Sequence, residues 1–140
     1  MEKAFYVVIL TALVSCSRFA IEEKIIDNYY LIATDTGEDC KLDYREPADE
    51  DSYGTIIGAT VFAVGHNDEY IIAKQHPRTF PKPPDKTITN YFILRVKKSM
   101  DWRSKDGQFG PLTLEQFNGK RNELGIPKDL GFTKVFKDLE

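Results

Sequence analysis

Asp35, Thr36 and Gly37 form the first group of residues whose types and spacing suggest chemistry. A carboxylate that follows an apolar run and precedes Thr-Gly is a candidate for acid-base catalysis. Such catalysis needs two carboxylates that share one proton. The chain has a single Asp-Thr-Gly triplet, so only a homodimer could supply the second carboxylate.

The triplet resembles the catalytic loop of aspartic proteases, and residues 55–60 (TIIGAT) resemble the apolar-Gly element that packs under such loops. Thr34 and Glu38 depart from that pattern, which has an apolar residue before the Asp and a small residue after the Gly. Asp-Thr-Gly-Glu-Asp also suits a hairpin loop, in which Asp35 bonds onward backbone amides and Gly37 takes a positive φ. We predict the hairpin loop. A dimeric aspartic-protease-like enzyme that uses Asp35 is the alternative.

The histidines and cysteines do not suggest a metal or a nucleophile. His66 and His76 stand at the two ends of a predicted strand, and at about 3.3 Å per residue they lie more than about 20 Å apart. Neither Ser nor Cys occurs in a recognisable nucleophile motif. We therefore predict no catalytic residues, no metal site and no cofactor.

The N-terminal segment has the anatomy of a secretory signal. Residues 4–14 are an apolar run, too short to span a bilayer, which takes about 20 residues. The run passes into the tetrapeptide Leu13-Val14-Ser15-Cys16, which resembles the bacterial lipobox. The resemblance implies that Cys16 is lipidated after cleavage of the bond before it. We predict a signal peptide over 1–15, a tether over 16–21 and a single globular domain over 22–140.

The predicted lipid on Cys16 places the protein on the extracytoplasmic side of a cell membrane, because two or three acyl chains give stable anchoring. Ser17 is not the Asp that favours inner-membrane retention, so the outer membrane is expected in a Gram-negative cell. Cys40 would then be the only free thiol, and we expect it to be a small buried core residue. The net charge of −3 and the lack of a strongly basic segment exclude nucleic acid as the main partner.

The elements that must position these residues are mostly strands. Alternation and turn residues predict strands over 29–34, 40–45, 56–64, 69–75 and 87–97. Thr113 and Gln116 form a capping-box pattern for one helix, which Gly125 ends. The predicted fold is α+β: an antiparallel β-meander of about five strands with one C-terminal helix packed on it.

One strand and the segment after it suggest a binding surface. Residues 76–86 hold four of the seven prolines and predict an extended, unpaired connector. In the strand before it, Ile71 and Ala73 share a face, and we expect them to pack on the helix through Leu114, Phe117 and Leu124. The opposite face would be exposed. The candidate binding residues there and on the next strand are Tyr70, Lys74, His76 and Tyr91.

Three stretches resemble a family of small bacterial lipoproteins of unknown function: 68–77 (DEYIIAKQHP), 89–94 (TNYFIL) and 110–127 (GPLTLEQFNGKRNELGIP). The resemblance implies a lipid anchor but no activity and no catalytic residues. We therefore expect a membrane-anchored lipoprotein, bound to the membrane through Cys16, whose domain is a non-catalytic binding module for a protein or envelope component. An inhibitor or immunity-type lipoprotein is a further alternative.

Overall fold

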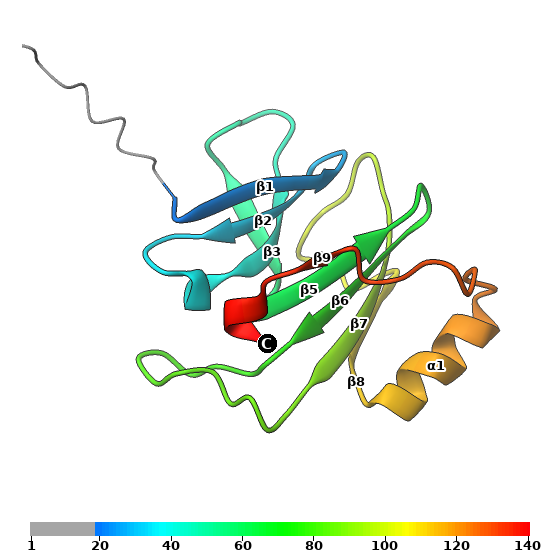
Figure 1. Ribbon diagram of the computed structural model, residues 1–140. Helices are drawn as coiled ribbons and strands as arrows, with labels where there is room; N and C mark the ends of the chain where they lie inside the picture. The colour runs from blue at the N-terminus through cyan, green and yellow to red at the C-terminus, as the bar shows by residue number, and fades with distance from the viewer. Residues whose placement is uncertain (1–18) are drawn as a thin grey trace, which may run out of the picture.

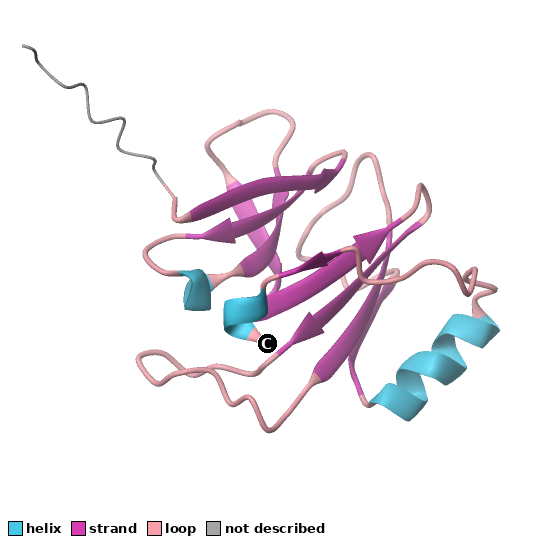
Figure 2. Ribbon diagram, in the orientation of Figure 1, coloured by secondary structure: helices cyan, strands magenta, loops and turns pink. Residues whose placement is uncertain are grey.

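The computed structural model describes residues 19–140, so the predicted signal peptide and Cys16 lie outside the described residues. Within residues 19–140 the chain forms nine strands in two antiparallel sheets, with a single α-helix (Figures 1 and 2). The α+β class and the antiparallel meander with one helix packed on it are confirmed. The strands number nine instead of about five because several short edge strands lack a clear alternating pattern.

The two sheets follow one another along the chain. The first has the order β1-β2-β3-β4 and the second the order β8-β7-β6-β5-β9. The strands are β1 Ile21–Ile26, β2 Tyr29–Ala33, β3 Lys41–Arg45, β4 Tyr53–Ile57, β5 Val61–His66, β6 Tyr70–Gln75, β7 Asn90–Arg95, β8 Gln108–Leu112 and β9 Lys134–Val135. The helix α1 spans Leu114–Glu123, and two 3-10 turns, η1 and η2, span Gly37–Asp39 and Lys137–Leu139.

The apolar stretch 56–64 is not one central strand, so that prediction is wrong. β4 ends at Ile57, β5 begins at Val61, and the three residues between them carry the chain from the first sheet to the second. A bulge opposite β3 lets both Ile56 and Ile57 be buried, which removes the alternation that would mark a sheet with one exposed face. The local pattern therefore cannot show that the two halves belong to different sheets.

Three strands, β1, β8 and β9, were not predicted. β1 begins at Ile21, and the Ala20 amide already donates to the Ala33 carbonyl at 2.8 Å. β8 contains Pro111, which an edge strand tolerates because its free side needs no amide donor.

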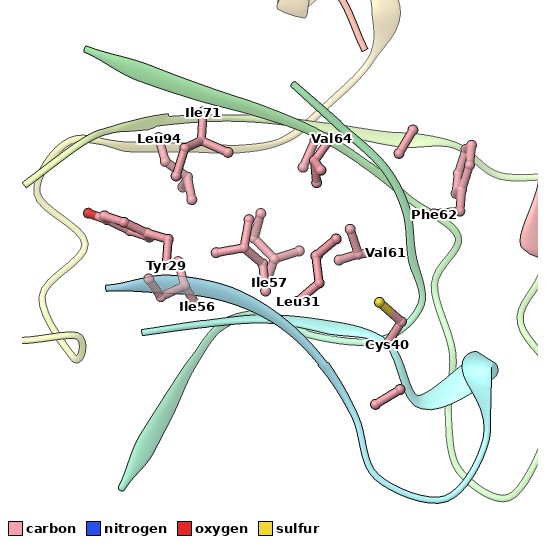
Figure 3. Packing of buried hydrophobic residues seen from close by; sticks show 14 of the residues in the cluster. Tyr29, Leu31, Cys40, Ile56, Ile57, Val61, Phe62, Val64, Ile71 and Leu94 are labelled. Carbon is pink, nitrogen blue, oxygen red and sulfur yellow. The ribbon is translucent and has the colours of Figure 1, made fainter. Parts of the chain in front are cut away.

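The main core lies between the two sheets (Figure 3). Leu31 on β2 and Ile57 on β4 face Val64 on β5 and Ile71 on β6, and each is almost fully buried. Burying such side chains contributes about 1.5–3 kcal/mol each. Both sheets therefore depend on the same apolar layer.

The helix begins and ends as predicted. The Thr113 hydroxyl accepts from the Gln116 amide, the Gln116 side chain accepts from the Thr113 amide, and Gly125 follows the helix with φ +65°. Within residues 19–140, no helix combines the length and apolar character needed to cross a bilayer.

The face of β6 that meets the helix is not the predicted one. α1 inserts Phe117 into a second cluster with Tyr70 and Ile72, whereas Ile71 and Ala73 belong to the core between the sheets. β6 is the middle strand of its sheet and is buried on both faces, so alternation could not identify the face under the helix. Leu114, expected in the contact, is 53% exposed.

The close approach of β5 to residue 131 yields a stability prediction. A Cβ at Gly65 would overlap the Gly131 carbonyl oxygen, which cannot move without its backbone. We expect Gly65→Ala to lower the free energy of unfolding by about 1–3 kcal/mol, measured by urea denaturation. Gly119→Ala is the matched control: no atom lies within 4 Å of the added Cβ, and Ala favours a helix by up to about 1 kcal/mol. Equal midpoints for Gly65→Ala and the unchanged protein would contradict this packing.

Candidate functional site

The segment between β6 and β7, residues 76–89, presents apolar side chains to solvent. Apart from a few turns it has no regular structure, which confirms the predicted unpaired connector. We call it the connector loop. Phe80 is 80% exposed and Ile88 is 47% exposed, and Leu114 is the one other large hydrophobic residue this exposed in residues 19–140. Exposed apolar side chains on one loop are typical of an interaction site.

His76 closes the base of the connector loop. Its ring is buried and stacks on the Phe62 ring, with 4.1 Å between the ring centroids. Nδ1 lies 2.7 Å from the Ile88 carbonyl oxygen. Because a carbonyl only accepts, Nδ1 carries the hydrogen and donates it. The two ends of the loop are thereby joined, at residues 76 and 88.

Arg78 fixes the loop to the β2–β3 turn. The side chain of Arg78 is only 9% exposed. Its guanidinium pairs with the Asp39 carboxylate at 2.5 Å and with Glu38 at 3.6 Å, and Nε donates to the Lys82 carbonyl at 2.9 Å. One side chain therefore holds the connector loop both internally and against a turn 39 residues earlier in the chain.

Asp39 is the acceptor on which this attachment depends. Its Oδ2 accepts from the amides of Asp35 and Thr36 at 3.2 and 3.1 Å. Desolvation acts to raise the pKa of Asp39, but the two amides and the Arg78 guanidinium outweigh it and hold that pKa below its ordinary value. The ionised carboxylate is therefore the stabilised form.

The far part of the loop is held as well. The Asp85 amide donates to the Pro77 carbonyl at 2.9 Å, and the Lys86 ammonium donates to backbone oxygens of Asp138 and Glu140, each at 3.1 Å. A loop fixed at several points loses little conformational freedom when something binds it. The connector loop is thus pre-ordered, with Phe80 facing solvent.

The Asp-Thr-Gly triplet lies in this same region, and the predicted hairpin loop is confirmed. β2 and β3 pair antiparallel on either side of it, and Asp35 is exposed. The carboxylate that bonds the turn amides is that of Asp39, not the expected Asp35, and Gly37 lies in the 3-10 turn η1 without the expected positive φ. Asp39 takes this role because η1 brings its side chain back over the start of the turn, where it forms a capping box with Thr36.

The four predicted binding residues do not form one exposed surface. Tyr70 and His76 are each 4% exposed, so neither presents its side chain to solvent. Lys74 and Tyr91 are partly exposed and lie together, with the Lys74 ammonium 5.8 Å from the Tyr91 ring centroid. Two contacts account for the difference. Phe117 of α1 packs on Tyr91 at 5.0 Å between centroids and shares a buried cluster with Tyr70, whereas His76 is buried against Phe62.

Cys40 is a buried core residue, as predicted. It is fully buried, and its burial, together with the charges of Asp43 and Glu23, raises the pKa of the thiol to about 12. The protonated thiol is a poor nucleophile and a poor metal ligand. Among the described residues, no group of three or more His, Cys, Asp or Glu side chains could hold a metal ion.

The residues that build this site were missed because their contacts are not local. Arg78 and Asp39 lie far apart in the chain, and nothing in either neighbourhood identifies the other as its partner. Phe80 did have a signal: it is a large apolar residue in a polar, proline-rich stretch that no strand could bury.

Loss of the Arg78 charge should lower the stability of the fold and also reduce how much stability the fold loses in acid. We expect Arg78→Gln to lower the free energy of unfolding at pH 7 by about 1–3 kcal/mol, since it removes charged hydrogen bonds from a mostly buried group. The depressed pKa of Asp39 gives stability that is present above its ordinary pKa near 3.9 and is lost as the pH falls through the folded-state value. Without Arg78 that depression shrinks, so less stability should be lost between pH 7 and pH 3.

Urea unfolding at both pH values measures this change. Arg103→Gln is the matched control, because Arg103 is 70% exposed and its pair with Asp101 should contribute less than about 1 kcal/mol. If the two variants lose the same stability and keep the same pH dependence, Arg78 does not hold the loop.

Comparison with known proteins places this site in a family without an assigned activity. No curated protein and no solved structure matches the chain. A family model described as "Protein of unknown function (DUF3997)" matches residues 26–136, which include both sheets' central strands, the connector loop and α1. The chain therefore belongs to the DUF3997 family of proteins of unknown function.

Proposed function

We propose that this protein is a membrane-anchored bacterial lipoprotein whose domain is a non-catalytic binding module of the cell envelope. The observation that carries the proposal is the apolar run 4–14, which passes directly into Leu13-Val14-Ser15-Cys16. Lipid on Cys16 would hold the protein on the extracytoplasmic side of the membrane, in the outer membrane where the cell has one. The first strand begins at Ile21, so the domain would sit close to its anchor.

The connector loop is the proposed binding surface, in place of the sheet face that α1 covers. Its exposed Phe80 and Ile88 offer apolar area, and its anchoring residues Arg78 and Lys86 pre-order it. Apolar anchors on an ordered loop contribute most of the affinity at many interfaces. Binding, not catalysis, is what this arrangement supports.

Lipidation of Cys16 is the first test of the proposal. Mass spectrometry of the native protein should find an N-terminal, acylated Cys16 in the membrane fraction. Cys16→Ala should abolish the acyl group and leave the protein soluble or unprocessed, because no other residue of the motif supplies a sulfur atom. Ser17→Ala, one residue away, should keep both the acyl group and the membrane fractionation. Soluble protein that begins with an unmodified Met1 would refute the anchor.

The aspartic-protease alternative has its own test. Asp35→Asn should change the free energy of unfolding by less than about 0.5 kcal/mol, because Asp35 is exposed and Asp39 holds the turn. Membrane localisation and partner binding should also be unchanged. A peptidase activity that the natural protein has and Asp35→Asn alone lacks would establish the alternative.

A further inference from the structure

The exposed apolar residues of the connector loop lie at the end of the domain where the described chain begins. In Figure 1 the start of β1, the β2–β3 turn and the tip of the connector loop lie on the left, and the β5–β6 turn lies at the opposite end of β6, at the upper right. The contacts agree with the view. The Ala20 amide donates to the Ala33 and Thr34 carbonyls, and Thr34 and Phe80 line the same surface hollow.

The distance to the proposed anchor is short. The four residues from Cys16 to Ala20 can span at most about 14 Å, even when fully extended. Acyl chains on Cys16 would lie in the bilayer, so Ala20 and the surface beside it could not move far from the headgroups. Phe80 belongs to that surface through its shared hollow with Thr34.

We infer that the occupant of the connector loop is the lipid bilayer itself, with Phe80 inserted at the headgroup boundary of the membrane that holds the anchor. This inference rests on the lipid anchor proposed above. A large aromatic side chain that is 80% exposed gains apolar surroundings there. Lys82, exposed two residues further along the chain, can extend its ammonium to lipid phosphates. The loop would thus fix the orientation of the domain on the membrane.

The arrangement of charges favours this reading. Arg78, which stands beside Phe80, is paired with Asp39 and Glu38 and faces the domain. Its charge therefore needs no partner in the membrane, and inserting Phe80 leaves the pair intact. Ile88, the other exposed apolar residue of the loop, follows Lys86, whose ammonium is likewise bound by the chain's own C-terminal oxygens.

Spin labelling of the full, lipidated protein tests the inference. Phe80→Cys would carry a nitroxide, and Asp68→Cys, exposed in the β5–β6 turn at the opposite end of β6 from the connector loop, is the matched control. The natural cysteines should not interfere, since Cys40 is buried and Cys16 would carry the proposed lipid. The labelled proteins are placed in phosphatidylethanolamine–phosphatidylglycerol vesicles, and collision rates with oxygen and with a water-soluble nickel chelate are compared.

At position 80 we expect oxygen collisions to exceed nickel collisions, which reports a depth of about 5–10 Å below the headgroups. At position 68 nickel collisions should dominate. An acylated protein whose position-80 label reports water, like position 68, overturns the inference and leaves the lipid anchor standing. Mass spectrometry of the same sample separates the two failures, since a Cys16 without acyl chains overturns the anchor and the inference together.

Discussion

Thr60 is the constraint on which the rest of this structure depends. It lies fully buried where the chain passes from the first sheet to the second. Its amide donates to the His76 carbonyl and its carbonyl accepts from the His76 amide, at 2.9 and 3.0 Å. Its hydroxyl donates to the Glu38 carbonyl in a short hydrogen bond of 2.5 Å. One buried residue therefore joins the crossover, the β2–β3 turn and the base of the connector loop.

This junction explains why the core and the candidate site cannot be separated. The crossover at residues 58–60 lets β4 and β5 face each other across one apolar layer. The same crossover brings Glu38 and Asp39 beside the start of the connector loop, where Arg78 meets them. Buried backbone groups must find partners, and here those partners come from segments remote in the sequence. The packing that stabilises the sandwich thus also places Phe80.

How far the sequence could predict this fold depended on whether the decisive contacts were local. The capping box at Thr113, the hairpin around Asp35 and the unpaired proline-rich connector were all predicted, because each rests on residues within a few positions of one another. The crossover inside 56–64 and the face of β6 under α1 were not. In both, apolar residues are buried on the two faces, so periodicity carries no information about which side is which.

In the candidate site, too, local features were predicted and features that depend on remote contacts were not. The prolines located the connector loop, but His76 was expected at an exposed rim and is instead buried against Phe62. Its Nε2 has no hydrogen-bond partner within residues 19–140, an unfavourable arrangement that the stacked ring and the bond to Ile88 must offset. No pattern in the local sequence requires a histidine to be buried in this way. Only the assembled loop does.

The helix and the connector loop differ in the contacts that hold them, and that difference supports the proposed binding surface. α1 is attached to the second sheet by apolar packing around Phe117, and this packing has a clear role in stabilising the fold. The connector loop is attached by ion pairs and hydrogen bonds from Arg78, His76 and Lys86, while its largest apolar side chain faces solvent. Phe80 gives the fold little in that position, since its one nearby ring contact is with the Arg78 guanidinium, 5.8 Å from the ring centroid. A loop ordered at several points to display a side chain that does not stabilise it supports the proposed contact with a membrane.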